Sequence, residues 1–152
     1  MNWTDFFTAI VALYGAALST YIFVVEIRSK KRQISIKLSH AVIFSGPNVS
    51  PSLLQITVAN PGNRTVTINT PSLLLPNKKS LVFPQPKSDV SFPHELLEGK
   101  NCAVWTDMGI LKHELKAEGY SGKIKVIAEV TDATDKKYRS KKSFSIIVPI
   151  ES

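Results

Sequence analysis

The first hydrophobic pattern in the chain is a continuous apolar run near the N-terminus. Residues 6–25 read FFTAIVALYGAALSTYIFVV, without a charge or a proline. A helix rises roughly 1.5 Å per residue, so this run spans about 30 Å, the thickness of a bilayer's hydrocarbon core. The pattern predicts a single transmembrane helix over about residues 6–27, within an anchor segment that comprises residues 1–32.

Beyond the anchor, the pattern changes to short stretches in which apolar and polar residues alternate. A period of two is typical of strands with one buried face. Two of the stretches surround a polar turn at residues 132–137 and predict a C-terminal hairpin. The predicted strands lie at residues 34–39, 54–59, 65–69, 73–75, 81–83, 102–105, 123–130 and 142–148.

One stretch in this region has the helical period instead. Asp107 can cap a helix that ends at Gly119, and three apolar residues would share its buried face. These residues are Met108, Leu111 and Leu115. The sequence therefore predicts one short helix among the strands.

Turn signals separate the predicted strands. The run Asn60-Pro61-Gly62-Asn63 favours a type II turn, in which Gly62 would supply the positive φ. Prolines are concentrated between Pro71 and Pro93, which indicates edge strands and loops there. We therefore expect residues 33–152 to form one mainly β domain, an antiparallel β-sandwich.

Three segments resemble strands and turns of immunoglobulin-like sandwiches. They are NPGNRTVTI at residues 60–68, LLEGK at 96–100 and YSGKIKV at 120–126. An N-terminal transmembrane anchor followed by such a sandwich resembles small bacterial inner-membrane proteins. The chain has one cysteine and so lacks the cysteine pair of antibody-type domains. The resemblance therefore implies an architecture, with no activity attached to it.

Charges at the two ends of the apolar run predict its orientation. Asp5 precedes it, and four basic residues follow it in the segment that enters the domain. By the positive-inside rule the N-terminus faces out and the β domain is cytoplasmic. The same four residues could also attract an anionic leaflet. They are Arg28, Lys30, Lys31 and Arg32.

Small residues recur along one side of the predicted anchor helix. Small side chains let two membrane helices approach closely, which suggests self-association or pairing with a partner helix. They are also common in membrane helices in general, so both interpretations stay open. The candidate packing face consists of Thr8, Ala12, Gly15, Ala16, Ser19 and Thr20.

The chain has a formal charge of +7, and its densest basic cluster lies in the C-terminal hairpin. The cluster could be a solvated turn, protect a strand edge, or bind anionic lipid or an acidic protein. A membrane tether makes nucleic acid the less favoured partner. This candidate basic patch consists of Lys136, Lys137, Arg139, Lys141 and Lys142.

Residues suited to catalysis or metal binding are sparse. Cys102 is the only cysteine, which excludes an intramolecular disulfide, and its apolar neighbours indicate a core position. It could act as a nucleophile only if a histidine such as His94 approached it. None of His40, His94 and His113 shows ligand spacing. We expect no cofactor, no metal, no small-molecule substrate and no enzymatic activity.

Three hypotheses for function remain. The first is a membrane-anchored, non-catalytic protein-interaction or scaffold module, with the bilayer and a protein partner or second copy as its contacts. In the second, the transmembrane helix oligomerises as a membrane effector or as a subunit of a membrane complex. In the third, the domain binds envelope components on the extracytoplasmic side.

Overall fold

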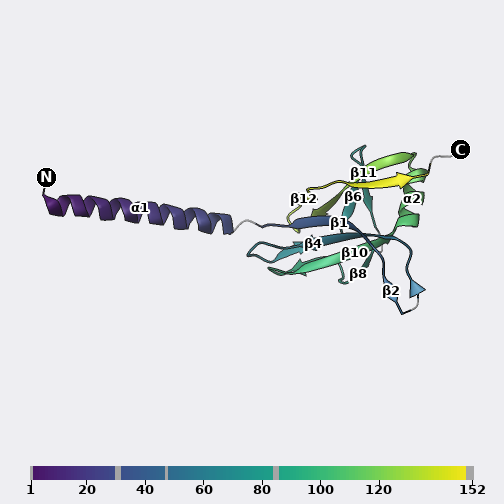
Figure 1. Cartoon of the computed structure of the whole chain (residues 1–152), viewed down its shortest axis with the longest axis horizontal. Helices are drawn as coiled ribbons and strands as arrows, with labels where there is room; N and C mark the ends of the chain where they lie inside the picture. Colours follow the sequence, from purple (N-terminus) through teal and green to yellow (C-terminus); the bar gives the residue numbers. More distant parts are fainter. Residues whose placement is uncertain (1, 30–31, 47, 84–85, 150–152) are drawn as a thin grey trace.

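The protein consists of an N-terminal helix followed by a mainly β domain (Figure 1). The computed structural model describes residues 2–29, 32–46, 48–83 and 86–149. Helix α1 covers Trp3–Ser29, slightly beyond both ends of the predicted span. It is long and apolar enough to cross a membrane, and none of its apolar window is buried inside the protein. All sides of α1 are therefore open to lipid or to another helix.

The first sheet is antiparallel and contains four strands in the order β1-β4-β10-β8. Strand β4 pairs along its whole length with β1 on one side and β10 on the other. Its alternate residues Leu54, Ile56 and Val58 are buried, which confirms the predicted period of two. The strands are β1 (Ser35–Ala41), β4 (Leu53–Ala59), β8 (Lys87–Ser88) and β10 (Asn101–Asp107).

The second sheet contains five antiparallel strands and is built around the long strand β11. Strands β12 and β13 both pair with β11. Strand β6 also pairs with β11, and the outer strand β7 pairs with β6. The strands are β6 (Ser72–Leu74), β7 (Ser80–Val82), β11 (Gly122–Thr131), β12 (Lys137–Arg139) and β13 (Phe144–Val148).

The C-terminal hairpin is present, but its return strand is interrupted. Two residues of β11 face four residues of the return segment between the pairs Glu129↔Arg139 and Val126↔Phe144. Ser140 occupies this bulge: its backbone N–H donates to the Ala128 carbonyl, and its Oγ accepts from the Ala128 N–H at 3.2 Å. The bulge thus keeps the backbone of β11 hydrogen-bonded while the return strand shifts register.

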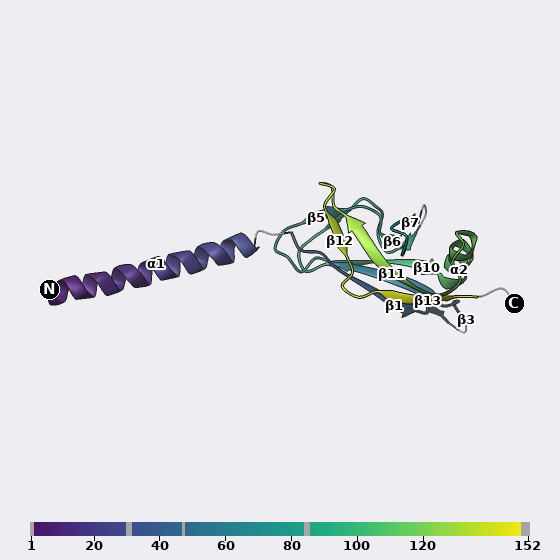
Figure 2. The same ribbon diagram turned by 90° about the horizontal axis from the view of Figure 1, so that it is seen from above.

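Two short strand pairs complete the β structure. Strands β5 (Val66–Ile68) and β9 (His94–Leu96) pair with each other, and Ile68 also bridges to Asp132 at the end of β11. Strands β2 (Phe44–Ser45) and β3 (Asn48–Val49) form a separate hairpin. In both ribbon views β2 or β3 lies at the end of the domain away from α1 (Figures 1 and 2).

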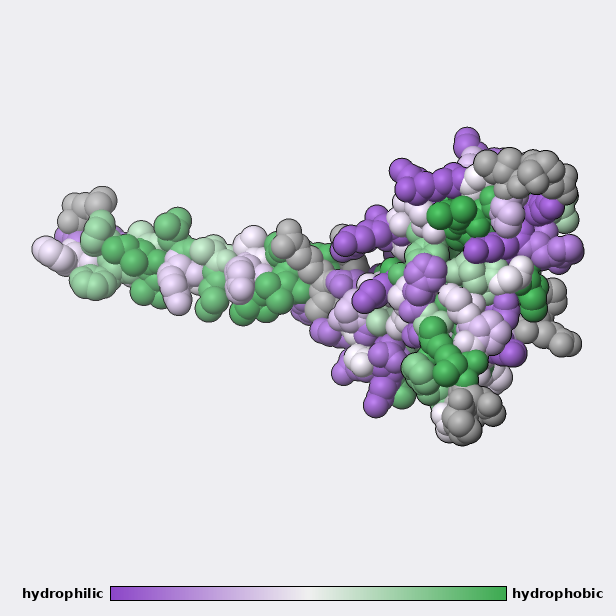
Figure 3. Space-filling view, turned by 45° about the vertical axis from the view of Figure 1, so that its right-hand side comes forward, coloured by the Kyte–Doolittle hydropathy of each residue, from purple (hydrophilic) through white to green (hydrophobic). Residues whose placement is uncertain are grey.

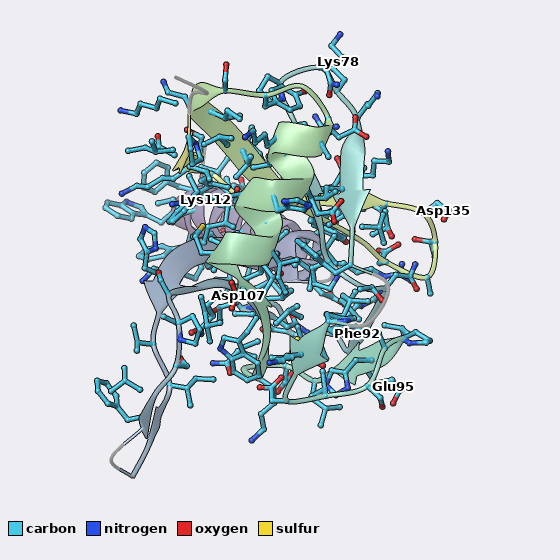
Figure 4. All side chains as sticks on the ribbon, turned by 90° about the vertical axis from the view of Figure 1, so that its right-hand side faces the viewer. Lys78, Phe92, Glu95, Asp107, Lys112 and Asp135 are labelled. Atoms are coloured by element: carbon cyan, nitrogen blue, oxygen red, sulfur yellow. The ribbon has the colours of Figure 1, made fainter. Side chains whose placement is uncertain are left out.

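Helix α2 (Met108–Ala117) begins where the sequence predicts. Asp107 Oδ1 accepts hydrogen bonds from the backbone N–H groups of Gly109 at 2.7 Å and Ile110 at 3.3 Å. Figure 4 shows Asp107 at the start of the helix. Gly119 follows the helix with a φ of 86°, a conformation that favours glycine. The predicted buried face, Met108, Leu111 and Leu115, is confirmed.

A single hydrophobic cluster joins the two sheets, the β5–β9 pair and α2. Cys102 belongs to this cluster and is fully buried, as its apolar neighbours predict. The chain passes between the sheets several times, since β1 and β4 are followed by β6 and β7, and then by β8 and β10. The core is therefore assembled from segments far apart in the sequence.

The predicted type II turn at residues 60–63 is wrong. Gly62 does not have a positive φ. Instead, the side-chain oxygen of Asn60 accepts the Gly62 N–H at 3.1 Å, so a side chain organises this turn. Space still favours glycine there, because a Cβ would make a tight contact of 3.2 Å with the backbone nitrogen of Gln33.

Candidate functional site

The connection to α1 determines which end of the domain lies nearest the membrane helix. Only two residues separate Ser29, the last residue of α1, from Arg32. Consecutive Cα atoms are roughly 3.8 Å apart, so this connection spans at most about 11 Å. The surface that holds Arg32 therefore lies beside the end of α1, as Figures 1 and 2 show. We call it the linker end.

Arg32 is held at the linker end by a buried carboxylate in the β11–β12 turn. Its guanidinium lies 3.4 Å from Asp132 Oδ2 and donates to Thr134 Oγ1 at 2.9 Å. Asp132 is 1% exposed and also accepts from the N–H and hydroxyl of Thr134, the N–H of Lys136 and the hydroxyl of Tyr138. Asp132 thus organises the polar turn that the sequence predicts at residues 132–137, and it contacts the linker in addition.

These hydrogen bonds determine the protonation of the network. Burial alone would raise the pKa of Asp132, but the hydrogen bonds from Thr134, Lys136 and Tyr138 outweigh it and lower the pKa to about 2. Burial, together with the bond to Asp132, raises the pKa of Tyr138 to about 12. At neutral pH the network consists of a carboxylate, a neutral phenol and a guanidinium.

A second buried polar side chain organises the neighbouring loops. Asn60 is fully buried, and its amide nitrogen donates to the carbonyl oxygens of Arg64 at 2.6 Å and Leu96 at 2.9 Å. Its backbone N–H and C=O bond to Lys100 and Gly99. Asn60 thus joins the β4–β5 and β9–β10 connections.

Two cations of the predicted basic patch pair with the same acid. Glu129 on β11 is 6% exposed, and its carboxylate lies 2.7 Å from Arg139 Nε and 3.4 Å from Lys137 Nζ. Burial opposes ionisation, but the hydrogen bond from Arg139 and the charge of Lys137 lower the pKa of Glu129. Glu129 on β11 thus forms ion pairs with Lys137 and Arg139 on the neighbouring strand β12. These cross-strand pairs give both basic residues a structural role.

The rest of the patch borders a cleft between the linker and the hairpin. The cleft has a volume of about 460 Å³, and Arg32, Lys136, Arg139 and Lys141 contribute to its lining. Lys136 Nζ lies 5.1 Å from the centre of the Tyr138 ring, a cation–π geometry. We call this the linker cleft. Lys142 borders an adjacent groove together with Lys141 and Lys37.

The sequence predicts two separate sets of basic residues, the membrane flank and the basic patch. The structure instead places members of both sets in one cleft. Arg32, predicted as a membrane flank, joins Lys136, Arg139 and Lys141 in one cleft. Lys30 and Lys31 lie outside the described residues, and of Arg28 only the helical backbone is described. The contact between Arg32 and Asp132 joins residues 100 positions apart, so no local pattern could have indicated it.

The predicted packing face of α1 is exposed and consists of small side chains. The hydroxyls of Thr8 and Thr20 donate to the carbonyl oxygens of Thr4 and Ala16 in their own helix, both at 2.8 Å. A Cβ at Gly15 would have no neighbour within 4 Å. The six residues of this face contact no other element of the domain, and their role as a packing surface stays a prediction.

The far end of the domain carries a feature that the strand pattern missed. Strands β2 and β3 and the residues before them expose four large apolar side chains, and Phe44 is 74% exposed. Figure 3 shows hydrophobic atoms gathered at the lower edge of the domain, where this hairpin lies. The signal was the non-alternating apolar run before the Ser-Gly-Pro-Asn turn. The apolar hairpin consists of Val42, Ile43, Phe44 and Val49.

Among the described residues, no hydrogen bond joins Cys102 to a histidine. Burial raises the pKa of the Cys102 thiol to about 11, with a further contribution from Asp89, which disfavours the reactive thiolate. His40 is exposed, and its ring centroid lies 4.6 Å from that of Phe144 with the rings tilted by 59°, while His113 lies on α2 and His94 on β9. Within the described residues, no three His, Cys, Asp or Glu side chains form a metal-ion site.

Comparison with known proteins adds no assignment to this geometry. No protein-family model matches the chain, and no curated protein matches it either.

Proposed function

We propose that this protein is a membrane-anchored, non-catalytic interaction module that binds a protein partner through the apolar hairpin. The observation that carries the proposal is the exposure of Val42, Ile43, Phe44 and Val49 on one projecting hairpin. Scattered apolar residues are normal on protein surfaces, but a contiguous group of large ones marks an interaction site. Phe44 is the natural anchor, since aromatic side chains dominate the cores of interfaces.

The position of the hairpin suits this role. The linker cleft and α1 occupy one end of the domain, and β2 and β3 lie toward the other (Figures 1 and 2). In Figure 4, viewed from that far end, the hairpin projects away from α2 and the rest of the domain. A partner that approaches from the aqueous side would reach the hairpin without displacing the anchor.

Site-specific photocrosslinking in intact host cells tests the proposal. A photoreactive amino acid at Val42 should give a discrete crosslinked product in the full-length protein, and Phe44→Ser should reduce that product strongly. Val82→Ser is the matched control, because Val82 is also exposed and apolar but lies on β7, outside the hairpin. An unchanged product in Phe44→Ser, or none at Val42, would contradict binding through the hairpin.

We also propose that the β domain has an immunoglobulin-like fold and lies in the cytoplasm. Two antiparallel sheets that share one core support an immunoglobulin-like sandwich, although α2 interrupts the strand order. The basic residues that follow α1 support a cytoplasmic β domain with the N-terminus outside.

Oligomerisation through α1 is the second candidate function. The exposed face of α1 at Thr8, Ala12 and Ala16 supports this candidate. The hydroxyl of Thr8 is already hydrogen-bonded within the helix. Leucine at Ala12, Gly15, Ala16 and Ser19 should then abolish crosslinked oligomers while insertion persists. Unchanged oligomers in the leucine variant, or none in the parent protein, would remove this candidate.

A further inference from the structure

The linker cleft holds more positive charge than its neighbouring carboxylates balance. Arg32 pairs with Asp132, and Arg139 pairs with Glu129, and both carboxylates are buried. Lys136 and Lys141 are exposed and have no carboxylate partner among the described residues. The cleft therefore presents two uncompensated ammonium groups beside two anchored guanidinium groups.

The covalent connection places this charge close to the bilayer. Helix α1 has 27 residues and is therefore about 40 Å long, which exceeds the roughly 30 Å hydrocarbon core. Its last turn thus reaches the headgroup layer, and Arg32 follows within about 11 Å of Ser29. A membrane-spanning α1 would thus place the linker cleft at the depth where lipid phosphates begin.

The remaining lining of the cleft fits an amphipathic ligand. Ile34, Ile36 and Pro61 line it together with the cations, so apolar and cationic groups lie side by side. Tyr138 supports Lys136 through its ring while its hydroxyl is bound to Asp132. A phospholipid offers both a phosphate for the ammonium groups and the first methylenes of its acyl chains for the apolar wall.

We propose that the linker cleft binds the phosphate of an anionic lipid headgroup, in the leaflet from which α1 emerges, and thereby holds the β domain against the membrane surface. Lys136 and Lys141 provide the direct charge, while Arg32 and Arg139 are fixed by their carboxylates. This binding does not depend on the apolar hairpin, which lies toward the other end of the domain.

Hydrogen exchange of the full-length protein in lipid nanodiscs tests this proposal. Amides of residues 132–142 should exchange more slowly in discs that contain phosphatidylglycerol than in discs of phosphatidylcholine alone. Each basic residue near an anionic surface contributes enough for about fivefold in binding, so two lysines should slow exchange by about 25-fold. The variant Lys136→Gln/Lys141→Gln should lose this difference.

A charge-matched variant serves as the control. Lys112 lies on α2, and Lys78 lies in a turn whose neighbour Lys79 pairs with Glu118 just after α2 at 3.0 Å. Figure 4 shows Lys112 beside α2 and Lys78 at the upper edge of the domain. Lys78→Gln/Lys112→Gln should therefore keep the slowed exchange. Equal unfolding temperatures of both variants in phosphatidylcholine discs would confirm that neither substitution disrupts the fold.

Three results would overturn the proposal. Exchange that is equal in the two kinds of disc would show that the cleft does not recognise anionic lipid. Equal losses in both glutamine variants would assign the effect to total charge and not to the cleft. If inorganic phosphate reproduces the protection in phosphatidylcholine discs, the cleft binds free phosphate and not a lipid headgroup.

Discussion

At the scale of single residues, two buried polar side chains hold the linker end together. Asp132 binds the linker through Arg32 and closes its own turn, while Asn60 joins two loops. Buried polar groups stabilise a fold only when their hydrogen bonds are satisfied, and one lost partner is costly. These two positions should therefore respond to nearly isosteric substitutions that leave the volume of the side chain unchanged.

Asp132→Asn should destabilise the domain by about 2 kcal/mol, because hydrogen bonds to a charged acceptor are stronger than neutral ones and Arg32 loses its ion pair. Denaturation in detergent, followed by Trp105 fluorescence, would measure the change. Asp135→Asn is the control, since Asp135 is exposed in the same turn and its φ of 59° also suits asparagine. Equal losses in the two variants would contradict a special role for Asp132.

The same carboxylate predicts a dependence of stability on pH. Its pKa is about 2 in the folded protein against an ordinary value of 3.8, so the unfolded chain takes up the proton first. The contribution of Asp132 is complete above the ordinary value and is lost as the pH falls from there toward 2. Unfolding midpoints recorded across this window should fall less steeply in Asp132→Asn than in the parent protein.

Asn60→Asp should cost about 3 kcal/mol, because a carboxylate cannot donate to the carbonyl oxygens of Arg64 and Leu96. Thermal unfolding would measure the loss. Asn63→Asp adds the same charge at an exposed position of the same loop and should change stability little. A stable Asn60→Asp variant would show that the two donated bonds are not needed.

At the scale of elements, the helix and most strands follow from local periodicity, whereas turns and register do not. The buried faces of β4 and α2 are the ones that alternation and helical spacing predict. The turn after β4 was predicted incorrectly because the side chain of Asn60, and not the φ of Gly62, organises it. The bulge at Ser140 depends on the register of β11, which the sequence of the return strand alone does not specify.

Helix α2 permits a direct test of local structure. Asp107→Ala should destabilise the domain by about 1 kcal/mol, since the N–H groups of Gly109 and Ile110 lose their acceptor. Asp107→Ser, which can still cap the helix, should restore most of this loss. Urea denaturation of the three proteins would measure the series, and an alanine variant as stable as the parent would contradict the importance of the cap.

At the scale of the whole molecule, candidate site residues cluster through contacts that sequence patterns do not reveal. Arg32 precedes β1 of the first sheet and Asp132 follows β11 of the second, so their contact depends on how the two sheets pack against each other. The basic patch was predicted as a set, but the structure separates Lys137, bound to Glu129, from Lys136 and Lys141 in the linker cleft. The apolar hairpin was missed because its strands are too short to show alternation.

The orientation of the whole chain decides which leaflet the linker cleft faces and in which compartment the apolar hairpin lies. We expect Asn2→Cys to react with a membrane-impermeant maleimide in intact cells, and Lys78→Cys to react only after permeabilisation, because a positive flank favours the cytoplasmic side for the segment that follows it. Both positions are combined with Cys102→Ala. Native Cys102 itself should react slowly in the folded protein, since it is fully buried and its pKa is about 11. The reverse labelling pattern would place the β domain outside the cytoplasm, where the linker cleft would face the outer leaflet and a partner of the hairpin would be an envelope component.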